Sequence, residues 1–181
     1  MAKEAALDAY GMEHTFSAAE VTEAQFPGFK TRAIEKLQDL SDYLEVISNT
    51  EYERSMRKQM MEQALALFTT KDAIVEMDAS PLDQARAHTI RRLLKGTLNH
   101  EYGLVKIGLS DIAFTDGFVR TADGNYRGVI DYTQSVARVI ADEISVDETK
   151  GKRATVIVMK VEKDFGGTSE MVWEVLIEEI K

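Results

Sequence analysis

The sequence predicts an α+β fold, in which amphipathic helices of the N-terminal half pack against an antiparallel sheet formed by the C-terminal half. Two observations predict it. From Phe29 to about Leu98, apolar residues recur at steps of three and four, the period of a helix with one buried face. After His100 the period changes to two, as in a strand with one buried face. Helices that precede a run of strands are typical of α+β domains.

Composition limits the classes of function. The chain has 181 residues, of which 44% are hydrophobic, so we expect a single folded domain with a substantial core. Its 22 basic and 31 acidic residues give a formal net charge of −9, which opposes binding to the phosphates of nucleic acid. The absence of cysteine excludes disulfides, thiolate zinc sites and cysteine nucleophiles. We therefore expect no nucleic-acid partner.

The chain divides into an acidic helical lead-in, residues 1–25, which we expect to be weakly held, and one α+β domain, residues 26–181. The lead-in carries one base, Lys3, against five carboxylates. No apolar stretch approaches 18 residues, so we expect no insertion into a membrane. The protein is expected in the cytoplasm if Met1 is the native start, and in the periplasm if a signal peptide was removed.

Three helices are predicted. The first runs from residue 29 to about residue 48, after Pro27-Gly28. The second begins at a capping box formed by Thr50 and Glu53, and its methionines are expected to be mostly core. The third begins at Ser80-Pro81, carries His88 and ends near residue 98. Residues 73–77 between the last two are predicted to form a short strand.

Four longer strands follow, at residues 103–114, 128–140, 153–162 and about 168–178. Tight turns are expected at Asp116-Gly117, Asp123-Gly124 and Gly166-Gly167. A further turn is expected at residues 147–150, between the second and third of these strands. Asp164-Phe165-Gly166 spells a kinase triplet, but the other kinase motifs are absent, so it is interpreted as part of a hairpin turn.

This order of elements resembles the NTF2-like superfamily, and several details are similar to small bacterial NTF2-like proteins of unknown function. The details are the sequences ALALF at 64–68, DGNYRG at 123–128, DETK at 147–150 and WEVLI at 173–177. The resemblance spans about residues 29–180. It implies a sheet curved around helices into a cone with an inner pocket, and homodimerisation through the outer sheet face.

The resemblance does not imply one chemistry, because this fold hosts enzymes, transport factors and interaction modules. The enzymes of the superfamily place an Asp or His in the cone as proton acceptor, with a Tyr or Asp as oxyanion donor. No motif of this chain matches either constellation residue by residue. No catalytic residue and no cofactor is therefore assigned by the resemblance.

Alternation along residues 128–140 identifies candidate ligand-binding residues. Tyr132, Gln134 and Arg138 share the parity of Ile130 and Val136, so they enter the cone if that face is the inner one. A Tyr, a Gln and an Arg suit a small anionic or carbonyl compound. Trp173 on the last strand would supply an aromatic wall. A self-satisfied hydrogen-bond network, or the opposite parity, remains open as an alternative.

Three functions are carried forward. The first is a non-enzymatic domain that binds a small molecule or a protein. The second is an isomerase or dehydratase acting on a small carbonyl compound, with His100 as base and Tyr132 as donor, or with Asp131 and Tyr102 if the strand parity is reversed. The third is a structural interaction protein with a filled cone.

The histidines and the basic clusters do not predict a specific binding site. The histidines at 14, 88 and 100 have no metal-ligand spacing, so no metal site is expected, and His100 is expected to contact a helix C-terminus. Two basic clusters are interpreted as solvated helix faces, with an anion-binding or partner-docking patch as the alternative. The clusters are Arg54, Arg57 and Lys58, and Arg91, Arg92 and Lys95.

Overall fold

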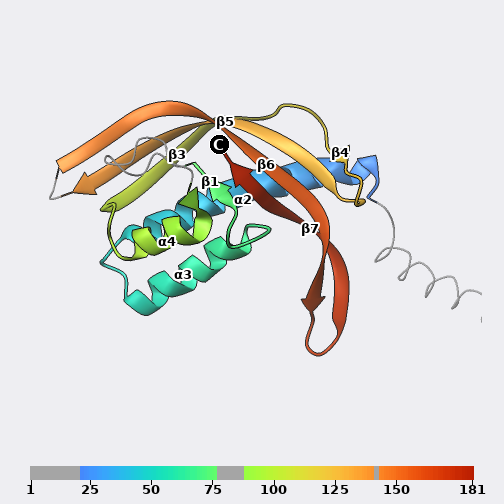
Figure 1. Cartoon of the computed structure of the whole chain (residues 1–181), viewed down its shortest axis with the longest axis horizontal. Helices are drawn as coiled ribbons and strands as arrows, with labels where there is room; N and C mark the ends of the chain where they lie inside the picture. Colours follow the sequence, from blue (N-terminus) through green and yellow to red (C-terminus); the bar gives the residue numbers. More distant parts are fainter. Residues whose placement is uncertain (1–20, 77–87, 141–142) are drawn as a thin grey trace, which may run out of the picture.

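The computed structural model describes residues 21–76, 88–140 and 143–181. Within these ranges the chain forms a seven-stranded sheet with helices packed on one side of it (Figure 1). The strand order is β2-β1-β7-β6-β5-β3, and β4 pairs with one end of β5. All pairs are antiparallel except β1 with β7. This is the predicted α+β architecture, three helices on a mostly antiparallel sheet, as in the NTF2-like cone.

The bounds of the elements are as follows. A 3-10 turn, η1 (Glu23–Gln25), leads into α2 (Phe26–Ser48), and then come α3 (Arg54–Ala66), β1 (Ile74–Val75), β2 (His88–Thr89) and α4 (Ile90–Leu98). The remaining strands are β3 (Leu104–Phe114), β4 (Val119–Arg120), β5 (Tyr126–Ile140), β6 (Glu143–Asp164) and β7 (Ser169–Ile180).

Helix α2 buries one stripe along its whole length. Ala33, Leu37, Leu40, Leu44 and Ile47 are each at most 3% exposed, as the sequence periodicity predicts. The helix begins three residues earlier than predicted, because Pro27 lies in its first turn, where a missing backbone N–H costs nothing. Its end at Ser48 is as predicted.

Two predicted helix starts need correction. Glu53, not Thr50, is the N-cap of α3, and no side chain caps that end, so the predicted capping box is wrong. His88 lies in β2 rather than on a helix, and α4 begins at Ile90 with the Thr89 hydroxyl accepting from the Arg92 amide. The predicted start at residues 80–83 lies outside the described residues.

The predicted turn at residues 147–150 is also wrong, because these residues lie inside the long strand β6. The register of β6 against β5 shifts there: Gln134 pairs with Lys150 and Val136 with Asp147, so two residues of β6 oppose one of β5. That pattern is a β-bulge, which bends a strand without ending it. The turns at Asp123-Gly124 and Gly166-Gly167 are confirmed, with positive φ at Gly124, Gly166 and Gly167.

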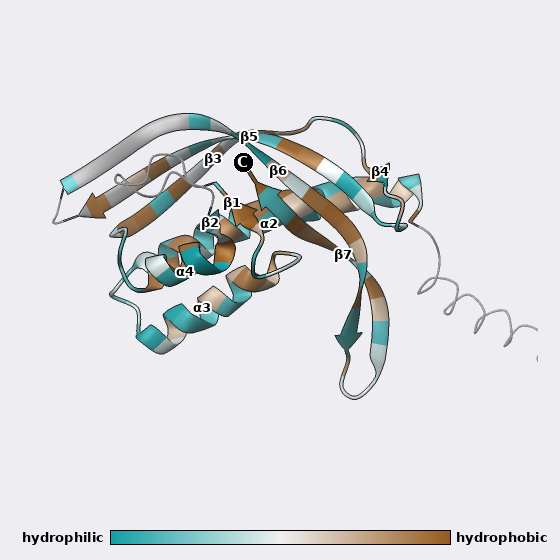
Figure 2. Cartoon of the chain, viewed as in Figure 1, coloured by the Kyte–Doolittle hydropathy of each residue, from teal (hydrophilic) through white to brown (hydrophobic). Residues whose placement is uncertain are grey.

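The core lies between the sheet and the helices. Ile130 on β5, Val156 and Val158 on β6 and Ile177 on β7 are fully buried. Strand β3 alternates between hydrophobic and hydrophilic residues, and α3 is largely hydrophilic, as Figure 2 shows. Near the start of α2, the ring of Phe26 packs against the rings of Phe118 and Tyr126. No helix among the described residues is long and apolar enough to cross a membrane.

Candidate functional site

In the middle of β5, two neighbouring polar side chains of the inner face are buried. Tyr132 is 4% exposed and Gln134 2% exposed, and they alternate with Ile130 and Val136, which are also buried. The structure therefore has the strand parity that the ligand-binding prediction requires. Arg138 pairs through its backbone with Val105 of β3, but its side chain lies outside the described part of the structure.

A third polar side chain joins them from the neighbouring strand. Lys152 of β6 pairs with Tyr132 in the ladder and is 8% exposed. Side chains of residues paired across two strands lie on the same face within contact range. We call Tyr132, Gln134 and Lys152 the inner polar group. The sequence analysis missed Lys152, although its parity with Ala154, Val156 and Val158 along β6 would have placed it on the inner face.

Burial has different consequences for Tyr132 and for Gln134. Desolvation raises the pKa of the Tyr132 phenol above its usual value, so the side chain stays a neutral donor and acceptor at physiological pH. Gln134 Oε1 has no hydrogen-bond partner among the residues that the structure describes. An unpaired buried acceptor costs roughly 1 to 3 kcal/mol, which a hydrogen-bond donor at that position would offset.

An open hollow of about 480 Å³ lies over the ion pair of Asp131 and Arg153, on the side of the sheet away from the helices, and Gln134 is not among the described residues that line it. Tyr132 and Lys152 both contribute to its lining, together with Thr133, Gly151 and charged residues. It lies where β7 ends, because the backbone of Lys181, the residue after β7, exchanges hydrogen bonds with that of Arg153. The charged lining residues are Asp111, Asp131, Arg153 and Lys181.

The structure does not bring Asp131 into the cone. Asp131 is partly exposed and accepts two hydrogen bonds from Arg153, at 2.7 and 3.1 Å, and one from the Thr115 hydroxyl. Arg153, and then Thr115, hold the pKa of this carboxyl below its usual value. A base with a lowered pKa, bound by two partners, is poorly suited to proton abstraction. The reversed parity needed for an Asp131–Tyr102 pair is not present.

His100 and Tyr102 lie at the turn between α4 and β3. His100 is exposed with φ +62°, and its Nδ1 lies 3.1 Å from the carbonyl oxygen of Ser48, the last residue of α2. The ring therefore contacts a helix C-terminus, as predicted, although the helix is α2 rather than α4. Tyr102 packs against Gly96 of α4, where an added Cβ would lie 2.6 Å from the ring. The structure thus places neither residue with the buried Tyr132.

Trp173 lies far along the sheet from the inner polar group. Its ladder partner on β6 is Lys160, whereas the partner of Tyr132 is Lys152, eight residues away. At about 3.3 Å per residue this corresponds to roughly 26 Å. Trp173 instead contacts the ring of Tyr126 at 5.9 Å and the ammonium of Lys160 at 5.2 Å. The predicted aromatic wall is therefore not adjacent to Gln134.

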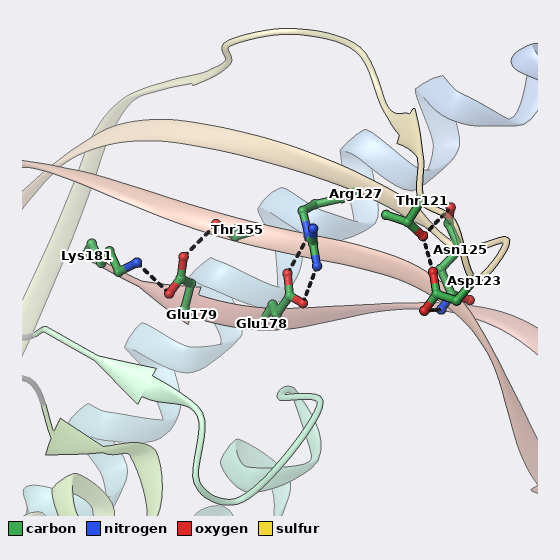
Figure 3. Close-up of polar contacts among 8 residues, drawn as sticks. All are labelled: Thr121, Asp123, Asn125, Arg127, Thr155, Glu178, Glu179 and Lys181. Atoms are coloured by element: carbon green, nitrogen blue, oxygen red, sulfur yellow. Dashed lines mark hydrogen bonds and ion pairs between the residues drawn. The ribbon is translucent and has the colours of Figure 1, made fainter.

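The outer side of the sheet carries paired charges, shown in part in Figure 3. Arg127 donates two hydrogen bonds to Glu178 at 2.7 and 2.8 Å, and Lys181 lies 2.8 Å from Glu179. Arg153 and Asp131 continue this set, which we call the outer ion pairs. The predicted homodimer through the outer face stays a prediction, and such a dimer would have to accommodate these charges.

One member of the first basic cluster, Arg57, does not lie at the surface, whereas Arg54 and Lys58 are exposed as expected. Arg57 is 6% exposed and donates hydrogen bonds of 2.7 Å to the carbonyl oxygens of Ile47 and Leu98. These carbonyls belong to the C-terminal ends of α2 and α4, which lack intrahelical partners. Burial, and then the charge of Arg54, lower the pKa of Arg57. Arg57 therefore links two helices. No metal-binding cluster of His, Asp or Glu occurs in the described ranges.

Comparison with known proteins gives two distant structural similarities. No family model and no curated protein matches the sequence. A periplasmic fragment of TraM is similar over 79% of this chain and 94% of its own, with a TM-score of 0.41 and 9% identity. A putative scytalone dehydratase from Novosphingobium aromaticivorans is similar over 87% and 90%, with a TM-score of 0.40 and 14% identity. These similarities assign neither an activity nor a partner to this chain.

Proposed function

We propose that this chain is a non-enzymatic binding domain that holds a small molecule at the inner polar group. The observation that carries the proposal is the buried Oε1 atom of Gln134, which has no partner in the described part of the chain. Polar groups in protein interiors are almost always hydrogen-bonded, so an unpaired one marks a position where another molecule donates. Tyr132 and Lys152, buried at adjoining positions of β5 and β6, supply further polar groups for such a molecule.

The unpaired atom also narrows the chemistry of the ligand. Oε1 is an acceptor, so the ligand must present an O–H or N–H group to it. A ketone or a fully ionised carboxylate cannot do this, whereas a hydroxyl, amine or amide can. The ligand class is therefore a small hydroxylated or amino compound, narrower than the anionic or carbonyl compounds expected from the sequence.

The dehydratase or isomerase alternative finds less support. Buried polar or charged side chains among the described residues are those of Ser48, Arg57, Thr97, Gln134 and Lys152, besides the phenols of Tyr126 and Tyr132. None is a carboxylate or an imidazole, the bases that proton abstraction requires in this type of site. Asp131 and His100 both lie at the surface.

The test is mass spectrometry of molecules released by denaturation from the purified protein. The wild type is compared with Gln134→Leu and with a matched control, Gln59→Leu, at an exposed position of α3. We expect a small compound with O–H or N–H groups from the wild type and the control, and at least ten-fold less of it from Gln134→Leu. Equal amounts from all three proteins, or no compound from any of them, would contradict the proposal and favour the filled-cone alternative.

A further inference from the structure

Cations are distributed unequally between the two sides of the molecule. On the sheet, Arg127, Arg153 and Lys181 each lie within 2.8 Å of a carboxylate. On the helical side, Lys71 and Lys95 have no carboxylate partner among the described residues. Arg91 reaches Asp72 only at 3.6 Å, with both side chains largely exposed. In a chain with a net charge of −9, three cations thus gather in this region with one weak ion pair among the described residues.

These cations border a half-open trough between α3 and α4. Its volume is about 220 Å³, and its lining residues, which define the helical trough, are Met61, Glu62, Leu65, Lys71, Arg91 and Lys95. The backbone fixes this shape, because the amide of Ile90 donates to the carbonyl oxygen of Ala73 at 2.8 Å and that of Arg91 to Lys71 at 3.3 Å. The start of α4 is therefore tied to the segment that follows α3.

The trough is apolar along its floor and continues beyond the cations. Met61 and Leu65 are one helical turn apart on α3, and Leu65 is 7% exposed. An adjoining hollow of about 280 Å³ shares Glu62, Leu65 and Lys71 with the trough and extends over Ala66, Phe68, Thr69 and Thr70. A ligand lying along this path meets the cations Arg91 and Lys95 at the α4 end and uncharged residues, Ala66, Phe68, Thr69 and Thr70, at the other.

We propose that the helical trough binds an unbranched aliphatic carboxylate. Its carboxylate would lie near Lys71, Arg91 and Lys95, where charge-assisted hydrogen bonds are stronger than neutral ones. Its alkyl chain would lie over the partly exposed Met61 and against Leu65, since burying apolar surface contributes roughly 25 cal/mol per Å². Glu62, on the opposite wall, disfavours a second negative charge and directs the carboxylate towards α4. This site is separate from the inner polar group and does not depend on it.

The test is a titration of the full chain with octanoate, followed by backbone amide NMR shifts. We expect saturable shifts at Leu65, Lys71 and Lys95, and binding at least ten-fold weaker for 1-octanol and for acetate, because each lacks one half of the recognised chemistry. The double variant Lys71→Gln/Lys95→Gln should bind octanoate at least ten-fold more weakly. The control variant Lys58→Gln, at an exposed lysine of α3 outside the trough, should bind octanoate as the wild type does.

Two further variants test the role of Glu62 and the separation of the two proposed sites. Glu62→Gln should tighten octanoate binding several-fold, because it removes the opposing charge. Gln134→Leu should leave octanoate binding unchanged, which separates this site from the inner one. The proposal is overturned if octanoate shows no saturable binding, if its largest shifts lie outside the trough, or if the double variant and the wild type bind it equally.

Discussion

Arg57 illustrates how one side chain connects two helices. Its guanidinium donates to the last turn of α2 and to the last residue of α4, and both bonds measure 2.7 Å. A planar guanidinium can reach two carbonyls at once, which an ammonium cannot do with the same geometry. The residue that a sequence pattern assigns to a basic surface cluster is therefore part of the packing between helices.

Replacing Arg57 by methionine should lower the free energy of unfolding by about 3 kcal/mol, because two buried carbonyls lose their donor. Urea unfolding followed by circular dichroism measures this. Lys58→Met, at the exposed neighbouring position, should change stability by less than about 0.5 kcal/mol. Equal effects of the two substitutions would show that the Arg57 bonds contribute nothing.

Tyr132 predicts a dependence of stability on alkaline pH. Burial raises the pKa of its phenol in the folded state, so above about pH 10, the usual value, the unfolded state loses a proton that the folded state keeps. Stability is therefore fully retained below pH 10 and falls as pH rises towards the folded pKa, by up to about 1.4 kcal/mol per pH unit from this group.

The measurement is the unfolding free energy of the wild type and of Tyr132→Phe between pH 8 and pH 11. The wild type should lose stability more steeply than the variant above pH 10, since phenylalanine does not titrate. Parallel curves for the two proteins would mean that the phenol is solvated in the folded state.

At the scale of elements, α2 covers part of the exposed edge of the sheet. Ser41 Oγ donates to the carbonyl oxygen of Ile107 at 2.7 Å, and Ser48 Oγ accepts from the amide of Val105 at 2.9 Å. Both serines lie on α2, seven residues apart, which is two helical turns. Because edge strands with free backbone groups pair readily with other chains, these serines protect the start of β3 from such pairing.

Ser48→Ala should destabilise the protein by roughly 1 to 2 kcal/mol, because it leaves the buried Val105 amide without its acceptor. Hydrogen exchange read by NMR should show faster exchange of the Val105 amide in this variant. Ser55→Ala, at an exposed position of α3, serves as the control. Unchanged protection of Val105 in Ser48→Ala would contradict this role.

Sequence periodicity predicts the elements well where one face alone is buried. The stripe of α2 and the alternation of β3 and β5 are visible because apolar and polar residues separate cleanly. The turn predicted at residues 147–150 fails for a physical reason: a β-bulge and a turn both favour polar, poorly periodic residues, and only the partner strand distinguishes them. The capping box predicted at Thr50 is also wrong. The side chain of Asn49, and not that of Thr50, accepts a hydrogen bond from a backbone amide in this turn, the amide of Glu51.

Part of the candidate site can be predicted from the sequence. Tyr132 and Gln134 follow from parity along one strand, because alternation fixes which side chains share a face. Lys152 and the distance to Trp173 depend on the register between strands, which one sequence does not specify. Met56 is an exception among the methionines expected to be mostly core: it lies near the start of α3 and is 42% exposed.

At the scale of the whole molecule, the two sides differ in charge and in what they can bind. The curved sheet encloses the helices on one face and carries the outer ion pairs on the other (Figures 1 and 3). The hairpin of β6 and β7 extends away from the helices, and Phe165 at its turn is 56% exposed. Both proposed small-molecule sites, the inner polar group and the helical trough, lie on the helical side of the sheet.

The most direct test of the central claim is a crystal structure of the protein as purified, without added small molecules. We predict electron density for a non-protein molecule whose O–H or N–H group lies within hydrogen-bond distance of Gln134 Oε1. Density for water alone at that position, or a protein donor bonded to Oε1, would contradict the account, because the buried acceptor would then be satisfied without a ligand.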